Sequence, residues 1–155
     1  IKGFTIRHEF MTNGETLDYG SGFGFDATYY GIDGWDPISD PWNVHQNARS
    51  CYSVILCTYV LNVIPTIEER LAVIESIKKL LTWDGVAYIT VRNDKKNLNG
   101  WTKKGTFQTF VDLDYPVVRR TSGYITYQVM KEDDSTTRKH TPQDYDGDSY
   151  WSTDY

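Results

Sequence analysis

Apolar residues recur at helical spacing between Thr66 and Leu81. They are Ile67, Leu71, Ile74, Ile77 and Leu81. Steps of three and four residues place such positions on one face of a helix, so the segment is predicted to be an amphipathic helix. Thr66 and Glu69 form a capping box at its start, and Asp84-Gly85 provides a stop after its end.

Two continuous apolar runs flank this helix. Ser53 to Val60 and Val86 to Val91 are rich in β-branched and aromatic residues, which is typical of buried parallel strands. Strand, helix and strand in this order indicate a right-handed crossover unit. Further along the chain, alternation over Phe107 to Leu113 and over Tyr124 to Met130 predicts an antiparallel pair of strands that closes the sheet.

Nearer the N-terminus, a short apolar-acidic segment runs into glycines at alternate positions, Gly20, Gly22 and Gly24. Glycines at this spacing let the backbone turn tightly and approach a ligand closely. The segment GIDGWDP then ends in Asp36, where a carboxylate at the tip of a neighbouring strand can accept both hydroxyls of a ribose. Only 12 positions separate Gly24 from Asp36, which leaves room for barely two helical turns between the first two strands.

Together these elements predict an α/β fold with a reduced Rossmann-like, doubly wound sheet, mostly parallel and with a C-terminal antiparallel hairpin. A chain of 155 residues suits one domain. Residues 1–131 carry 14 acidic and 14 basic side chains, so the whole net charge of -5 lies in residues 132–155. We therefore expect a domain over 1–131 and an acidic, aromatic tail over 132–155, disordered by itself and able to contact a protein partner or a second copy.

Cysteine and histidine spacing indicates no metal site. Cys51 and Cys57 lack CxxC spacing and no secretory signal precedes them, so we expect free thiols in a reducing, cytoplasmic compartment, that of the host if the protein is viral. The three histidines, His8, His45 and His140, stand alone. No apolar run approaches the ~18 residues of a membrane helix, and the acidic tail argues against a nucleic-acid partner.

The ordered segments LDYGSGFGFD, GWDP, CTYVLNVIP, WDG and TVRND together resemble a class I S-adenosylmethionine-dependent methyltransferase. More closely, the chain is similar to small bacterial and phage methyltransferase-like proteins, over roughly Thr16 to Met130. The resemblance implies S-adenosylmethionine as cofactor and methyl transfer to a small-molecule or macromolecular acceptor that the sequence does not identify. Since the sulfonium methyl is already activated, the protein mainly has to align the nucleophile.

The resemblance also implies roles for individual residues. In that family the first glycine loop wraps the methionine part of the cofactor, and the corresponding residues here are Asp18, Gly20, Ser21 and Gly22. The acidic residue that ends the second strand holds the ribose, which implies Asp36, with Asp33 as a competing candidate. The strand that precedes the main helix ends against cofactor and substrate, which implies Thr58 as a cofactor contact and Tyr59 and Asn62 as catalytic candidates.

The sequence departs from the family pattern in several places. No acidic residue between Asn43 and Cys51 suits the adenine amino group, although Trp35 or Trp42 could either stack on the ring or pack in the core. The Asn-Pro-Pro-Tyr motif of nucleic-acid amino methyltransferases is absent, as is a Pro-Cys pair. A cluster of basic residues after the last predicted parallel strand either steers an anionic substrate or is a solvated loop. Its members are Arg92, Lys95, Lys96, Lys103 and Lys104.

Each of these signals also has a purely structural interpretation. The glycines could form a simple tight turn, Asp36 could cap the turn that Pro37 begins, and Tyr59 and Asn62 could be strand-end packing and a helix-approach cap. The alternative to an enzyme is a non-catalytic binding or phage assembly protein that retains the methyltransferase fold. The two differ in a testable way, because an enzyme keeps the space beside Gly22 and Asp36 open, whereas a scaffold fills it.

Overall fold

The computed structural model describes residues 15–22, 24–36 and 52–133 of the chain. Its helices are α1 (Phe25–Tyr30) and α2 (Ile67–Leu80), with a 3₁₀ turn η2 (Leu61–Val63). Its strands are β1 (Thr16–Tyr19), β2 (Asp33–Trp35), β3 (Tyr52–Thr58), β4 (Leu81–Arg92), β5 (Asn99–Trp101), β6 (Phe107–Thr109), β7 (Val117–Arg120) and β8 (Tyr124–Met130).

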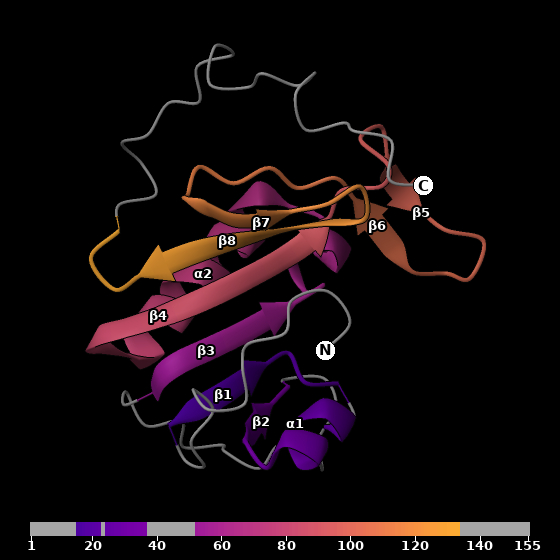
Figure 1. Ribbon diagram of the computed structural model, residues 1–155. Helices are drawn as coiled ribbons and strands as arrows, with labels where there is room; N and C mark the ends of the chain where they lie inside the picture. The colour runs from indigo at the N-terminus through magenta and orange to yellow at the C-terminus, as the bar shows by residue number, and fades with distance from the viewer. Residues whose placement is uncertain (1–14, 23, 37–51, 134–155) are drawn as a thin grey trace.

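Six of these strands form one mixed sheet in the order β2-β1-β3-β4-β8-β7 (Figure 1). The pairs β2/β1, β1/β3 and β3/β4 are parallel, whereas β8 runs antiparallel to both β4 and β7. Strands β5 and β6 form a separate antiparallel ribbon beyond the end of β4 (Figure 1). Because parallel strands point the same way, β1, β2, β3 and β4 all end at one edge of the sheet.

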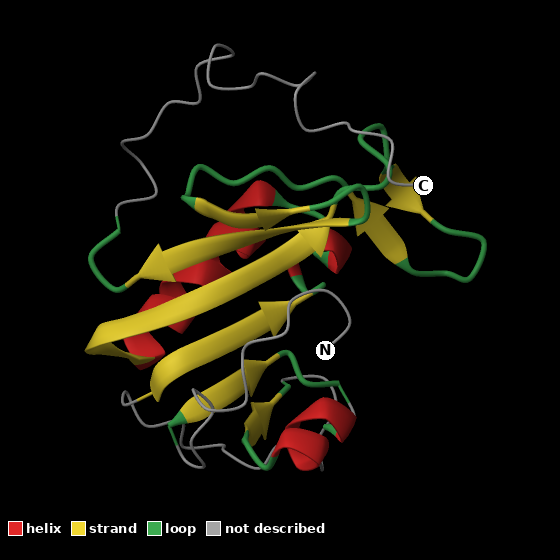
Figure 2. Cartoon of the chain, viewed as in Figure 1, coloured by secondary structure: helices red, strands yellow, loops and turns green. Residues whose placement is uncertain are grey.

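The predicted doubly wound, Rossmann-like fold is wrong. Strands take 42% and helices 22% of the described residues, which contain two α-helices, and the sheet is mixed with antiparallel parts (Figure 2). A doubly wound fold needs a helix at each crossover between parallel strands. Here only six helical residues connect β1 to β2, and the chain between β4 and β8 forms the ribbon and β7 instead of a helix.

Helix α2 covers one face of the sheet and contributes two side chains to the core on that side. Its Ile74 and Ile77 are fully buried and pack with Ile55, Ile89 and Val129 from β3, β4 and β8. A smaller cluster joins Ala27 of α1 and Ile32 to Leu56 of β3. Since adjacent residues of a strand face opposite sides of a sheet, α1 lies on the face opposite α2.

The strongest local predictions are confirmed. The helix predicted over Thr66 to Leu81 is α2, and Thr66 is its N-cap, with Oγ1 accepting from Glu69 N at 3.2 Å. The two apolar runs correspond to β3 and to the second half of β4, and the run from Tyr124 to Met130 is β8, antiparallel as expected.

Two local predictions need correction. The helix ends at Leu80 and passes directly into β4, where an irregularity between the Leu81 and Val86 pairings takes up the chain around Asp84-Gly85. The strand predicted over Phe107 to Leu113 is shortened to β6, which pairs with β5; the partner that closes the sheet beside β8 is β7. Pairing with β5 was not visible locally, because β5 is only three residues long.

Several predictions fall outside the described residues. They concern the side chains of His8, Trp42, His45, Cys51 and His140, the segment 43–51, and the tail beyond Asp133. Cys57 is described and is a free, fully buried thiol whose pKa is raised by that burial. Within the described ranges, no helix has the length and apolar character needed to cross a membrane.

Candidate functional site

The glycine loop that follows β1 is held in a backbone conformation that favours glycine. Gly20, Gly22 and Gly24 have φ values of +77°, +57° and +74°, a region in which side chains with a Cβ are strained. Gly20 is restricted further, because a Cβ there would lie 2.4 Å from Cγ2 of Val60, just beyond β3. At Gly22 no described atom lies within 4 Å of an added Cβ. The loop therefore packs against Val60 at Gly20, whereas at Gly22 it is not approached by the residues that the structure describes.

The same loop is tied to the end of β2 by backbone hydrogen bonds. The amides of Gly20 and Ser21 both donate to the carbonyl of Trp35, at 2.7 and 3.1 Å, and the amide of Gly22 donates to Oδ2 of Asp36 at 2.8 Å. The two features that the sequence singled out, the glycine loop and the carboxylate after the second strand, are therefore within one hydrogen bond of each other.

Asp33, the competing acidic residue, lies at the other end of β2. It pairs with Leu17 in the parallel register, and its Oδ2 accepts a hydrogen bond from the Tyr52 hydroxyl at 3.0 Å. Asp36 follows the last residue of the strand and so lies at the edge where β1 and β3 also end. Of the two carboxylates, Asp36 is the one beside the glycine loop.

Asp18 is a buried carboxyl group below this loop. It lies on β1 between Gly34 of β2 and Leu56 of β3, and only 6% of it is exposed. Burial raises the pKa of Asp18 to about 6, and the negative charges of Asp26 and Asp36 add to the shift. Asp18 thus changes its charge within the physiological range.

The hydroxyl of Ser21 is buried and has no hydrogen-bond partner among the described residues. It lies 3.1 Å from the position of a Cβ at Gly34, so the side chain is turned toward β2. Buried polar atoms are normally paired, so this hydroxyl is an exception within the described residues.

Tyr59 occupies a strained position where β3 ends. It is the one non-glycine residue with positive φ in the described part of the chain, at +60°, which costs of order 1–3 kcal/mol and is common at functional sites. Its amide donates to the carbonyl of Thr90 at 2.9 Å, and 36% of the residue is exposed. Thr58 precedes it, half-buried, opposite Thr90 in the register with β4.

Partial burial raises the pKa of Tyr59, and the neighbouring Tyr124 and Asp94 add to this while Arg92 opposes it. The phenol is therefore protonated at neutral pH. It can donate a hydrogen bond to an acceptor molecule, but it is poorly suited to remove a proton.

Asn62, the other catalytic candidate, has its amide engaged by the protein. It is 1% exposed, donates from Nδ2 to the carbonyl of Thr109 at 2.9 Å, and accepts at Oδ1 from the amide of Arg92 at 2.8 Å. One side chain thereby joins η2, β6 and the end of β4. We assign Asn62 a positioning role and retain Tyr59 as the candidate that faces an acceptor.

Sequence reasoning missed one feature of this edge, the fit of Val60 against Gly20, at a spacing that no motif specifies. Arg92, a member of the basic cluster, forms a two-point ion pair with Asp94, with Nε–Oδ1 and Nη2–Oδ2 distances of 2.8 and 2.6 Å. The spacing of two residues between the opposite charges indicates this pair, which agrees with the interpretation of the cluster as a solvated loop.

No protein-family model matches the chain, and a comparison with curated proteins finds no relative. The assignment of a function therefore rests on the residues of this edge.

Proposed function

We propose that the protein binds S-adenosylmethionine at the edge formed by the glycine loop and Asp36, and that it transfers the methyl group to an acceptor beside Tyr59. The observation that carries the proposal is the hydrogen bond from the Gly22 amide to Asp36. It holds a carboxylate suited to ribose hydroxyls next to Gly22, where an added Cβ would contact none of the described residues.

Charge favours this cofactor over an anionic dinucleotide. Between Glu15 and Asp36 the chain carries five acidic side chains and no basic one. Pyrophosphate sites use the N-terminus of a helix to hold negative charge, but α1 has six residues and carries Asp26 in its first turn. A cationic sulfonium with a ribose diol suits these surroundings better than a phosphate does.

Each residue of the edge has a distinct task in this proposal. Asp36 is the carboxylate beside the glycine loop that accepts the ribose hydroxyls. The Asp18 carboxylate, once ionised, stabilises positive charge through the low-dielectric interior. The protonated Tyr59 orients the acceptor. When bound, S-adenosylmethionine supplies an activated methyl group, so that alignment is the main catalytic requirement.

Calorimetric titration with S-adenosylmethionine and with S-adenosylhomocysteine tests the proposal. Asp36→Ala should weaken binding about 10- to 150-fold, the range expected when hydrogen bonds to a charged group are lost. The matched control is Asp33→Asn, which removes a carboxylate from the other end of the same strand and should bind as the unchanged protein does.

Equal affinity of the Asp36→Ala protein would remove the ribose assignment. Absence of binding by the unchanged protein would overturn the proposal as a whole and leave the non-catalytic assembly protein as the better account.

A further inference from the structure

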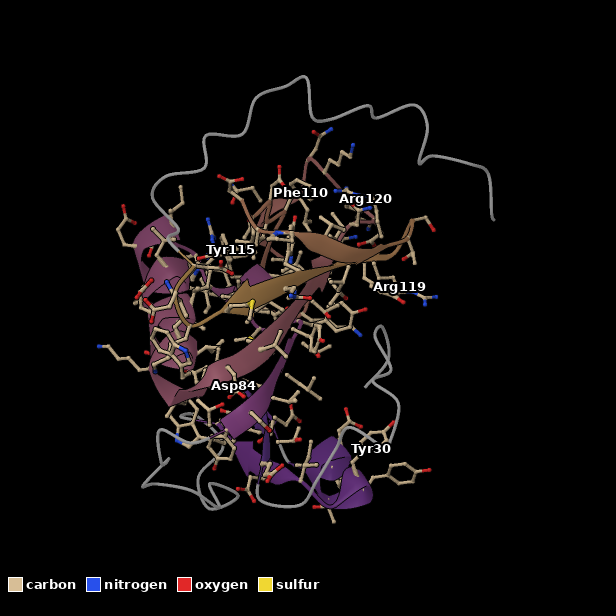
Figure 3. The ribbon with its side chains drawn as sticks, turned by 60° about the vertical axis from the view of Figure 1, so that its left-hand side comes forward. Tyr30, Asp84, Phe110, Tyr115, Arg119 and Arg120 are labelled. Atoms are coloured by element: carbon tan, nitrogen blue, oxygen red, sulfur yellow. The ribbon has the colours of Figure 1, made fainter. Side chains whose placement is uncertain are left out.

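Charge is separated along the six-stranded sheet. The acidic stretch from Glu15 to Asp36 belongs to β1, α1 and β2, at one end of the strand order. From Arg92 to Arg120 the chain carries seven basic and three acidic side chains. These residues lie at the end of β4, in the β5–β6 ribbon and its flanking segments, and on β7. Figure 3 shows Arg119 and Arg120 on β7, far from Tyr30 of α1.

The strand register brings the basic residues to one edge. Arg92 pairs with Tyr124, and Arg120 pairs with the adjacent Ile125, so the ends of β4 and β7 flank the start of β8. The β5–β6 ribbon continues from the same edge (Figure 1). Asp94 neutralises Arg92, so the lysines of the ribbon and its approach, together with Arg119, dominate the charge of this surface.

The tip of the ribbon is a defined, closed turn. The Thr102 amide donates to the Thr106 carbonyl at 2.8 Å, and the two threonine hydroxyls share a hydrogen bond of 2.8 Å. Lys103 and Lys104 lie between them and are exposed, and neither forms an ion pair with a described residue.

The exposed side chain of Trp101 shortly precedes these two lysines in the ribbon. Trp101 is 75% exposed and contacts the protein edge-on through Phe107, with ring centroids 5.8 Å apart and planes at 78°. A large aromatic residue normally gains by burial. Trp101 instead offers a ring face to the surroundings, next to two cations.

The base of the ribbon is closed and is connected to the main sheet. Phe110 N donates to the Leu98 carbonyl at 2.8 Å and closes the base. Asn62 Nδ2 donates to the Thr109 carbonyl, and Arg92 Nη1 at the end of β4 donates to Gln108 Oε1 at 3.3 Å. The lysines and the indole are therefore held on a supported platform at the edge of the sheet where Tyr59 lies.

We propose that the β5–β6 ribbon and its basic surroundings bind single-stranded nucleic acid. Lysines attract the phosphate backbone, and an exposed aromatic ring stacks on unpaired bases, a combination used by proteins that bind single strands. A duplex has no free base face for Trp101. The net charge of -5 argues against binding of a polyanion, but this charge comes from residues 132–155 and not from the segments that form the basic surface.

The inference goes beyond the proposed methyl transfer and does not depend on it, since its test uses no methyl donor. Fluorescence anisotropy with a labelled oligo(dT) of about 12 nucleotides, within the roughly 4–16 that one such site covers, measures binding by the full chain. Binding should fall with added salt, and Lys103→Gln or Lys104→Gln should each lower the salt slope by about one.

Trp101→Ala should weaken binding at least about fivefold, the lower end of the loss for one stacked base. Its matched control is Trp83→Ala, because Trp83 is also 75% exposed but lies near the start of β4. Lys79→Gln, an exposed lysine near the end of α2, is the control for the charge changes. Both controls should bind as the unchanged protein does.

Equal losses in Trp101→Ala and Trp83→Ala, or tighter binding of duplex than of oligo(dT), would overturn the proposal. Competition by polyglutamate at equal charge, unaffected by Trp101→Ala, would assign the surface to an acidic protein segment and would equally overturn it. Circular dichroism of each variant establishes that its fold is retained.

Discussion

The buried Asp18 carboxyl group contributes to the free energy of unfolding, and this contribution decreases as the pH rises. Folding keeps its carboxyl group neutral up to about pH 6, whereas in the unfolded chain it ionises with a pKa near 3.8. The contribution of this group is complete below about pH 4 and is lost as the pH rises through about 6.

Asp18→Asn removes this loss of stability at higher pH, because the amide does not ionise. The free energy of unfolding of the variant, relative to the unchanged protein, should therefore rise by up to about 3 kcal/mol between about pH 4 and pH 8. Urea unfolding at the two pH values measures it. A difference that stays constant with pH would contradict the burial of an ionisable Asp18, and because all other titrating groups are common to both proteins, their effects largely cancel.

Substitution of Gly22 tests whether this glycine is needed for ligand binding in addition to the backbone conformation. Gly22→Ala and Gly31→Ala both place a methyl group at positive φ, +57° and +66°, with no described atom within 4 Å of the new Cβ. Each should lower stability by about 1–2 kcal/mol. Gly31 ends α1, whereas Gly22 faces the proposed cofactor, so Gly22→Ala alone should lose S-adenosylhomocysteine binding in calorimetry. Equal binding by both variants would show that the loop does not approach a ligand.

At the scale of elements, the C-terminal end of α2 is contacted by a residue that follows β8. Lys131, directly after β8, donates from Nζ to the carbonyls of Lys78 and Leu81 at 3.0 Å each. Both carbonyls lie at the C-terminal end of α2, where the helix dipole favours a cation. The Lys78 carbonyl also accepts from the amide of Leu81, the C-cap residue. The ammonium group therefore caps the helix and connects it to β8.

Lys131→Met keeps the aliphatic stem and removes the cap. We expect a loss of about 1–2 kcal/mol in the free energy of unfolding, measured by chemical denaturation. Lys79→Met, which removes an exposed cation from the same turn, should change stability by less than about 0.5 kcal/mol. Equal losses in the free energy of unfolding for the two variants would show that the Lys131 ammonium group does not stabilise the end of α2.

What the sequence could predict follows from how local each interaction is. The apolar residues of α2 recur at helical spacing, and its N-cap Thr66 directly precedes it. The strands β3 and β8 are marked by an apolar run and by alternation of apolar and polar residues. These elements can therefore be predicted from local sequence. Strands β5, β6 and β7 span three or four residues each, and their pairing is set by tertiary contacts that no local pattern specifies. The error in fold class has another origin. The strand–helix–strand unit around α2 was extended to a doubly wound sheet, whereas only six helical residues connect β1 to β2 and the sheet is mixed.

The candidate site divides in the same way. The glycine loop and Asp36 could be brought together from sequence, because parallel strands end at one edge. The contact of Val60 with Gly20, the engagement of Asn62 by two backbone groups and the positive φ of Tyr59 could not, since each results from the packing of β3 against its neighbours.

At the scale of the whole molecule, the sheet has an acidic end at β1 and β2 and a basic end at β4 and β7, with Tyr59 of the β3 edge between them. A cationic nucleoside suits the first end and a polyanion the second. The net charge of the chain conceals this arrangement, because the two regions oppose each other. The proposals for the two ends are independent, and either can fail without the other.

The central claim is that the glycine loop and Asp36 form one cofactor site. A titration of the ¹⁵N-labelled protein with S-adenosylhomocysteine, followed by amide chemical shifts, tests it at the residues concerned. We predict the largest changes at the amides of Gly20, Ser21, Gly22 and Asp36, with the β5–β6 ribbon unaffected. Saturable binding with its largest shifts elsewhere, or no shifts in the loop at millimolar ligand, would contradict the account.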